Sequence, residues 1–367
     1  MNSDVILVIV VATALAFDFT NGFHDTANAI ATSVSTRAMT PRVAVLVSAV
    51  LNFAGAFISL EVAATVGKGI VDAGAVTTTV VFAGLIGAIA WNLATWYFGL
   101  PSSSSHALIG GIVGAAFAAN GASAINGNGL VEKVLVPGVL APILAFTVAG
   151  FSILIAYRIV GRLRPGPVNR GYRLGQLATA SMFSLAHGTN DAQKTMGIIT
   201  LALIAHGDLS ADNFAVPTWV IVSAASAIAL GTYTGGWRII RTMGSRIIKM
   251  DPAQGFSAQG AGAAVVLAAS HLGYPLSTTH VISGGVMGAG AAKSLSAVRW
   301  GVAGNIAVAW VLTLPAAAIG GALVYGFSSI FGSGALGPLI VSLSILSLVL
   351  AFLGRRVARG QVLTADA

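Results

Sequence analysis

Charged residues and cysteine are scarce in this 367-residue sequence. It has no cysteine, which excludes disulfides, iron–sulfur clusters and thiolate metal sites. Only 8% of its residues are charged, whereas soluble domains carry roughly 25%. The sequence is 56% hydrophobic, its mean hydropathy is +0.88, and its apolar runs are long enough to span a bilayer. The composition therefore predicts a polytopic membrane protein.

The N-terminal segment lacks the positive charges that open a secretory signal peptide. No Lys or Arg precedes Arg37, although Val5 to Phe17 is apolar and ends in small residues that resemble a cleavage site. We therefore expect this segment to remain in the protein as a transmembrane helix. The net charge of +8 lies in predicted loops, which is typical of positive-inside topology and not of nucleic-acid binding.

The sequence contains the same pair of polar motifs twice. Residues 99–115 and 273–289 are identical at eight of seventeen positions, including a Pro, a Ser, a His and the glycines that follow. Upstream of each copy lies an Asp motif, NGFHDTAN at Asn21–Asn28 and HGTNDAQK at His187–Lys194. Duplicated polar motifs within apolar sequence are typical of secondary transporters that are built from internal repeats.

The distribution of Lys and Arg predicts the membrane topology. Each half is expected to hold three crossing segments and one paired, re-entrant segment. These lie at 5–35, 42–66, 79–98 with 105–120, and 133–158, and then at 174–204, 216–237, 257–291 and 300–327. With the N-terminus outside, 16 of the 19 Lys and Arg residues are cytoplasmic. Because three crossings is an odd number, the second half enters the membrane from the opposite side.

The predicted fold is an all-α polytopic membrane protein with two inverted-topology repeats. Each repeat has a polar, broken transmembrane helix and a re-entrant helical hairpin. The predicted parts are the first repeat 1–158, an Arg-rich cytoplasmic linker 159–173, the second repeat 174–327, an additional transmembrane helix 328–356 and a cytoplasmic tail 357–367.

Both Asp motifs place polar side chains on one face of a helix inside the membrane. The spacing of three or four residues predicts the first face from Asp18, Asn21, Asp25 and Asn28, and the second from His187, Asn190, Asp191 and Lys194. A charge at the bilayer centre costs at least about 2.5 kcal/mol, so each needs a partner or a function. Structural contacts between helices are the alternative, but such contacts rarely recur at equivalent positions.

The two Pro-Ser/Thr-His motifs predict hairpin tips that are buried in protein. A proline ends one half-helix and a hydroxyl caps the next, which leaves backbone N–H groups able to attract an anion. The predicted anion ligands are Ser103, Ser104, Ser105, Ser277, Thr278, Thr279 and Lys194. His106 and His280 follow the tips, and the glycines beyond them predict close helix packing.

An oxyanion such as phosphate requires a cation when two carboxylates lie beside it. The predicted coupling-cation ligands are Asp18, Asn21, His24, Asp25, Asn28, Asn190 and Asp191. Among them, Asp25 and Asp191 are also candidates for a metal site. Import of a bare dianion against a potential of about 100 mV costs about 4.6 kcal/mol, and a co-transported proton, sodium ion or divalent metal removes that barrier. The charges therefore predict symport.

Together with the tract Trp91–Gly99, these motifs resemble the inorganic phosphate transporter (PiT) family over essentially the whole chain. The Gly-x-Asn-Asp signature of that family is complete at 188–191, whereas at 22–25 His24 replaces the first Asn. This variant resembles the low-affinity bacterial branch. The resemblance implies uptake of phosphate with protons or as a neutral metal–phosphate complex, without a covalently bound cofactor. It also implies a homodimer in the plasma membrane that works by elevator-like alternating access, and the charge distribution places the C-terminus in the cytoplasm.

Because position 24 is a histidine, the expected coupling ion differs from the sodium ion that drives other members of the family. Histidine changes charge near neutral pH, so we predict that protonated His24 replaces the sodium ion; a simple hydrogen bond across the helix interface is the alternative. Sulfate transport, and divalent metal transport through His24, Asp25, His187 and Asp191, stay open. An enzyme is not expected, because Val281 interrupts the Gly-x-Ser-Gly element that a nucleophile at Ser283 would need. Buried carboxylates also disfavour an anion channel.

Overall fold

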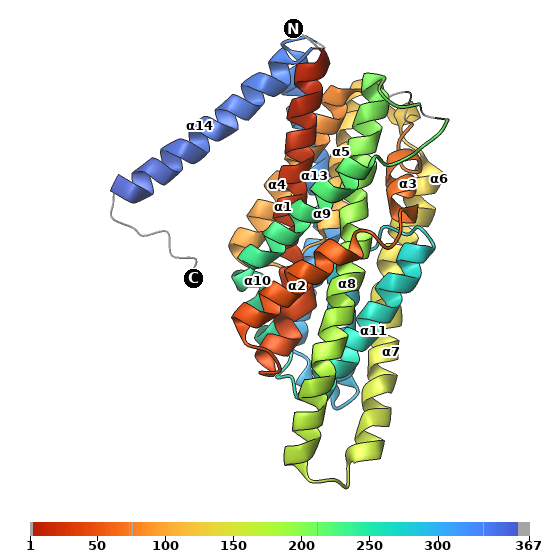
Figure 1. Cartoon of the computed structure of the whole chain (residues 1–367), viewed down its shortest axis with the longest axis vertical. Coiled ribbons are helices and arrows are strands. Elements are labelled where there is room, and N and C mark those ends of the chain that lie inside the picture. The colour runs from red at the N-terminus through yellow and green to blue at the C-terminus, as the bar shows by residue number, and fades with distance from the viewer. Residues whose placement is uncertain (1–2, 73, 75, 211, 333, 359–367) are drawn as a thin grey trace.

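The computed structural model describes residues 3–358 apart from 73, 75, 211 and 333. The described chain is almost entirely helical and forms one bundle, with α14 projecting from one end (Figure 1). The helices are α1 (Ser3–Ser35), α2 (Pro41–Gly55), α3 (Glu61–Lys68), α4 (Thr78–Phe98), α5 (Ser104–Asn120), α6 (Gly127–Leu130), α7 (Val136–Val160), α8 (Pro165–His206), α9 (Thr218–Thr234), α10 (Trp237–Arg241), α11 (Pro252–His271), α12 (Thr278–Ala291), α13 (Trp300–Ser329) and α14 (Leu336–Ala358).

Several helices have the length and composition of membrane spans. Among the described residues, α1, α4, the continuous segment Gly127–Val160 and α13 each pass this test. Helices α9 and α10 are bent by 60° relative to each other and would together make a fifth span. The prediction of an all-α polytopic membrane protein is confirmed. Helix α4, expected to be one arm of a re-entrant pair, is itself long enough to cross.

Helices α1 and α8 pack against each other and run in opposite directions. Phe17 in the first half of α1 belongs to the same apolar cluster as Met196 in the last part of α8. At the other end, Ile30 of α1 and Phe183 of α8 belong to a second cluster. The polar residues of both Asp motifs lie between these two apolar clusters. The order of apolar and polar residues along each helix therefore places a polar layer in the middle of the bundle.

Two helical hairpins reach this middle layer from opposite ends. The hairpin α4–α5 packs in the first apolar cluster and α11–α12 mainly in the second. Their tips meet, because the Ser105 hydroxyl donates to the Leu276 carbonyl oxygen at 3.0 Å. A Cβ atom at Gly114 would collide with the Ala318 carbonyl of α13, and one at Gly288 with the Phe146 carbonyl of α7. The predicted close packing at these glycines is confirmed.

The packing of the first half has a counterpart in the second half. Helix α1 packs on α9 and α8 packs on α2, while α5 packs on α13 and α12 packs on α7. Exchanging the two halves therefore maps these neighbours onto one another, as a pseudo-two-fold axis requires. The orientation of the halves in a membrane stays a prediction.

The prediction of one continuous crossing segment at 42–66 is wrong. Helix α2 ends at Gly55, and α3 begins at Glu61 after a turn. The side-chain oxygen of Gln193 on α8 accepts the backbone N–H groups of Val62 and Ala63 at 2.9 and 3.2 Å. These N–H groups have no partner within α3, so Gln193 stabilises a new helix start.

The structure also refines the predicted connections. Only residues 161–164 separate α7 from α8, so most of the predicted linker 159–173 is helical. Pro165 occupies the first turn of α8, where the missing N–H costs no hydrogen bond. Helix α14 begins at Leu336, later than the predicted start at 328, because α13 continues to Ser329. Within the predicted tail 357–367, residues 359–367 lie outside the described part of the chain.

Candidate functional site

The two Asp motifs meet in the middle polar layer. Asp25 on α1 and His187 and Asp191 on α8 are buried, and one ligand atom from each lies within 4.8 Å of the others. Carboxylate oxygens and an imidazole nitrogen are common metal ligands. These three residues, here called the cation cluster, are therefore able to hold a metal ion. The predicted proximity of Asp25 and Asp191 is confirmed, and His187 joins them.

In the first motif, His24 connects Asp25 to the α4–α5 hairpin. Its Nδ1 lies 2.7 Å from Asp25 Oδ1, and its Nε2 lies 3.1 Å from Thr95 Oγ1. The Ser102 hydroxyl donates to the same Thr95 oxygen at 2.8 Å. Both ring nitrogens of His24 therefore have polar neighbours, and the side chain links α1 to the hairpin. Its predicted protonation stays a prediction.

In the second motif, Lys194 is the fully buried basic residue of the site. Its ammonium group pairs with Asp191 and donates to the Ser105 hydroxyl and, at 2.7 Å, to the Leu276 carbonyl. Asp191 is also 3.1 Å from His187 Nε2. One positive group thus contacts a carboxylate and both hairpin tips. The expected role of Lys194 beside the tip hydroxyls agrees with this position.

Four of the six tip hydroxyls fall into two groups. Ser103 and Ser277 are N-caps, because their oxygens accept the backbone N–H of the histidine three residues later, at 3.1 and 3.3 Å. The predicted capping of the second half-helix by a hydroxyl is therefore confirmed. Thr278 instead donates to Asp191 and Thr279 to Asp25, each at 3.3 Å. The tip of α12 consequently contacts both carboxylates.

Amide side chains complete the centre of the site. Asn28 Nδ2 donates to Thr278 Oγ1 at 3.2 Å and to Thr279 Oγ1 at 2.8 Å. The Asn28 side-chain oxygen has no protein partner. Asn190 points elsewhere, since its amide donates to Ser270 Oγ at 2.8 Å and to the Tyr274 carbonyl at 3.1 Å. The Asn190 amide nitrogen therefore holds the α11–α12 hairpin, while its side-chain oxygen, like that of Asn28, has no hydrogen-bond partner among the described residues. Its predicted role as a cation ligand stays a prediction.

Asp18 is a buried carboxyl group that has no ion-pair partner among the described residues. Its nearest polar neighbours are the side chains of Thr195 and Asn21, which interact with it only weakly. An ionised carboxylate that is buried without a partner is very costly. A proton or a cation is the partner that remains. Asp18 lies about two turns of helix before Asp25, so it is separate from the cation cluster.

His106 and His280 contact each other instead of the cation cluster. Their ring centroids are 4.9 Å apart, and His280 also stacks on Trp310 with centroids 4.1 Å apart. They occupy equivalent positions in the two halves, so their contact is compatible with the predicted pseudo-two-fold relation.

The sequence analysis missed three groups that shape the site. Thr95 and Ser102 bind His24, although they stand in motifs that the analysis had already singled out. Gln193 caps α3 and was read only as part of the second Asp motif. His187 was placed on the correct helix face and was named for the alternative of divalent metal transport, but not among the predicted coupling-cation ligands. Its spacing of four residues from Asp191 was the available signal.

Every residue of the central site is buried. Lys194 is 1% exposed and Asp191 and His187 are 0% exposed, so the site is closed to solvent in this conformation. Asp18, Asp25 and Asp191 outnumber the one lysine among them. A phosphate ion that reaches the tips must therefore be accompanied by positive charge.

Comparison with known proteins identifies the family. The sequence profile described as "Phosphate transporter family" matches residues 21–321, which is most of the chain. The chain belongs to the phosphate transporter family. Members of this family are transporters and not enzymes, which excludes the alternative of an enzyme with a nucleophile at Ser283. Family membership and the apolar helices together place the transporter in a membrane.

Relatives across several bacteria match most of this transporter. A protein of Mycobacterium tuberculosis is 55% identical over 327 residues, which cover 89% of this chain and 78% of the relative. One from Rhizobium meliloti is 53% identical over 321 residues (87% and 96%), and one from Bacillus subtilis is 48% identical over 325 residues (88% and 96%). All three carry the name "Probable low-affinity inorganic phosphate transporter". The resemblance to the low-affinity bacterial branch is confirmed.

The fold of the transporter is also similar to that of a solved structure. That protein is described as "The sodium-dependent phosphate transporter" and superposes with a TM-score of 0.78 at 26% sequence identity. The match covers 87% of this chain and 98% of the other. The two proteins therefore share an architecture over nearly their whole length.

Proposed function

We propose that this transporter imports inorganic phosphate by cation-coupled symport, with alternating access to one central site. The observation that carries the proposal is the direct contact between an anion-binding half and a cation-binding half. Thr278 and Thr279 reach the two carboxylates, and Lys194 reaches both hairpin tips. A phosphate ion and its coupling cation would therefore bind next to each other.

The phosphate half of the site consists of hydroxyls, helix N-termini and one ammonium group. The proposed ligands are Ser103, Ser104, Ser105, Ser277, Thr278, Thr279 and Lys194. The tips of α5 and α12 each present backbone N–H groups beside these hydroxyls, and the helix dipole favours an anion there. Phosphate would replace the contacts of Thr278 and Thr279 with the carboxylates, which frees those carboxylates for a cation.

The cation half is centred on Asp25 and Asp191. Asn28 contributes an unpaired side-chain oxygen next to the tip, and His24 contacts Asp25 directly. Asp18, Asn21 and Thr195 form a second polar group nearby, in which Asp18 has no ion-pair partner among the described residues. We propose that the coupling ion is a proton, a divalent metal that enters with phosphate, or both, with sodium less favoured. His187 supports a divalent metal, because imidazole is a poor ligand for sodium and a good one for transition metals.

The arrangement of the two hairpins supports the proposal of alternating access. They reach the closed site from opposite ends and meet at Ser105 and Leu276. Withdrawal of one hairpin would open the site to one side while the other hairpin still covers it. We further propose that the N-terminus faces outward, that the C-terminus is cytoplasmic and that the protein is a homodimer in the plasma membrane.

Phosphate flux into proteoliposomes tests the proposal. We expect radiolabelled phosphate to accumulate in response to an inward proton gradient or to added Mg²⁺ or Zn²⁺, with little response to a sodium gradient. Vesicles that hold the Asp25→Asn/Asp191→Asn protein are the control, and these should show only the background flux of empty vesicles.

Competing ions decide between the alternatives. A tenfold excess of sulfate should leave phosphate uptake largely unchanged, whereas strong competition would indicate a sulfate permease. Uptake of labelled Zn²⁺ without phosphate would indicate a metal transporter, which the cation cluster makes the second candidate. Absence of phosphate accumulation under every gradient would refute the proposed function.

A further inference from the structure

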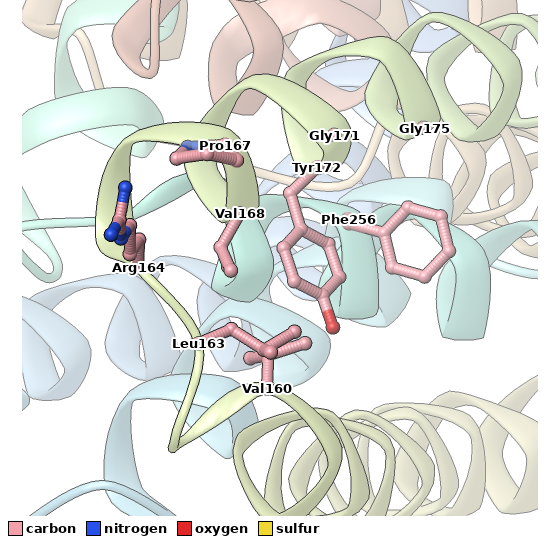
Figure 2. Close-up of a pocket in the computed structure, with 9 residues that line it drawn as sticks. All are labelled: Val160, Leu163, Arg164, Pro167, Val168, Gly171, Tyr172, Gly175 and Phe256. Carbon is pink, nitrogen blue, oxygen red and sulfur yellow. The ribbon is translucent and has the colours of Figure 1, made fainter.

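A cavity lies at the connection between α7 and α8, far along α8 from the central site. Its volume is about 620 Å³, within the range of pockets that bind small ligands. Figure 2 shows Leu163, Val168, Tyr172 and Phe256 around it, with Arg164 at one side. The lining is otherwise apolar, so a ligand needs an apolar part to fill it. Figure 1 shows that this end of the α7–α8 pair extends beyond the rest of the bundle.

Arg164 lines the cavity, and four further arginines lie near it in the sequence. The α7–α8 connection carries Arg158, Arg162, Arg164, Arg170 and Arg173, and all five are exposed. Within the described part of the chain, none of them makes an ion pair or a side-chain hydrogen bond. Asp251 lies close to Tyr157 and Tyr172, but it already accepts the Tyr157 hydroxyl at 2.7 Å and pairs with Lys293 at 3.6 Å. The local positive charge therefore has no protein counter-charge.

Large apolar side chains accompany these arginines on the outer surface. Ile159 is 71% exposed, Leu163 59% and Leu174 63%. They continue an exposed apolar stripe that runs along α7 from Val139, as expected of a surface that faces lipid. Alternating apolar and Arg side chains at the end of a spanning helix are typical of the level of lipid headgroups. The cavity thus opens where acyl chains end and headgroups begin.

We propose that this cavity is a binding site for an anionic phospholipid. An acyl chain fills the apolar space between Val168 and Phe256, and the lipid phosphate binds Arg164 and its neighbouring guanidinium groups. Inorganic phosphate has no apolar part to fill the cavity, so it fits less well. A zwitterionic lipid has no net negative charge to balance the five unpaired arginines. Helix α8 runs without a break from this cavity to Asp191 and Lys194, so the lipid would bind the helix that carries the central site.

Two glycines of α8 provide a matched pair of variants. Gly171 lines the cavity, and a side chain there meets no protein atom within 4 Å, so Gly171→Leu fills the cavity. Gly166 likewise has open space around it but does not line the cavity, which makes Gly166→Leu the control. Leucine has the higher helix propensity, so neither change is expected to destabilise α8. Arg164→Gln removes the charge and leaves the cavity in place.

Native mass spectrometry of the purified full-length protein measures lipid binding directly. Wild type and Gly166→Leu should retain phosphatidylglycerol in preference to phosphatidylcholine. Inorganic phosphate at about 10 mM should not displace the lipid, although this concentration is roughly tenfold above a millimolar dissociation constant for phosphate. Binding of phosphatidylglycerol should fall about tenfold or more in both Gly171→Leu and Arg164→Gln. For Arg164→Gln, this is the range expected when a charge-assisted hydrogen bond is lost. Gel filtration checks that each variant is folded.

Three results would overturn the proposal. These are equal binding of the two lipids by the wild type, displacement by inorganic phosphate, and unchanged binding in a folded Arg164→Gln protein. If Gly171→Leu does not fold, Arg164→Gln alone decides. The assay does not depend on transport, so its outcome is separate from that of the flux experiment.

Discussion

The two Asp motifs of this transporter have the same position in their repeats but different partners. Asp25 on α1 contacts a histidine next to it in sequence, His24, and one hydroxyl of α12. Asp191 on α8 contacts Lys194 three residues later, His187 four residues earlier and the adjacent hydroxyl of α12. The second half therefore pairs its carboxylate with a lysine, and the first half does not.

This difference separates the roles of the two halves. Lys194 contacts Ser105 of one tip and Leu276 of the other, so the fixed charge lies where phosphate is proposed to bind. Among the described residues, Asp25 has no lysine beside it, and its side chain contacts His24 and the Thr279 hydroxyl. We infer that the second half supplies most of the attraction for the anion and the first half most of the requirement for a cation.

The largest expected effects come from removing either carboxylate. Asp25→Asn and Asp191→Asn should each abolish driven phosphate uptake, about 100-fold or more, because the coupling cation loses a charged ligand worth about 3 kcal/mol. The two should differ in stability. Asp191→Asn leaves the Lys194 ammonium buried without a counter-charge, which costs about 3–5 kcal/mol. Asp25→Asn leaves no ammonium group unpaired, because Lys194 still pairs with Asp191. Flux in proteoliposomes and thermal unfolding in detergent measure the two properties.

A double variant separates stability from transport at Asp191. In Asp191→Asn/Lys194→Met, the unpaired ammonium is gone, so thermal stability should return toward wild type while uptake stays absent. Wild-type accumulation in either single variant would end the assignment of these carboxylates to the cation. If the two single variants were equally stable, the proposed difference between the halves, a paired lysine at Asp191 and none at Asp25, would be contradicted.

Smaller effects are expected at the hairpin tips. Thr278→Ala and Thr279→Ala should raise the apparent Km for phosphate about tenfold or more, since a hydrogen bond to a charged group is worth about 1.5–3 kcal/mol. Ser104→Ala should raise it less, because its hydroxyl reaches only His24 Nδ1, at 3.5 Å. Ser226→Ala is the control, as that hydroxyl only bonds back to the Val222 carbonyl of its own helix.

Concentration dependence of initial uptake rates measures these changes. If Ala substitutions at all six tip hydroxyls left phosphate affinity unaltered, the anion would have to bind elsewhere. A larger effect at Ser104 than at Thr279 would show that the α5 tip, and not the α12 tip, makes the main contacts.

The smallest expected effect concerns the choice of cation. In His24→Asn, an amide oxygen replaces an imidazole beside Asp25, and hard cations prefer oxygen ligands. We expect uptake to gain a sodium stimulation of up to about threefold over choline buffer, as an affinity change below 1 kcal/mol allows. The same change in the second half, His187→Asn, should give a smaller sodium stimulation, because Lys194 already pairs with Asp191. Identical responses to sodium in wild type and His24→Asn would contradict this role for His24.

Local features of this structure could be predicted from the sequence when their causes lie close together in the chain. The hairpin arms expected at 79–98 and 105–120 agree within one residue with α4 and α5, because Pro, Ser and Gly mark their ends. The meeting of Asp25 with Asp191 also followed from helical spacing and duplication. The break between α2 and α3 could not be predicted, since the capping oxygen of Gln193 comes from a distant helix. The contact of Thr95 with His24 depends in the same way on how α4 packs against α1.

The bonds of Lys194 have a consequence for the energy stored across the membrane. One ammonium group binds the tips of both hairpins, through the Ser105 hydroxyl and the Leu276 carbonyl. Withdrawal of one tip leaves Lys194 with the other tip and Asp191, but withdrawal of both leaves a nearly bare ion pair in the middle of the bilayer. Such a conformation would be an open aqueous pore through which protons could run down their gradient. In the proposed alternating-access cycle the shared lysine would disfavour that conformation, and phosphate would then cross without dissipation of the membrane potential.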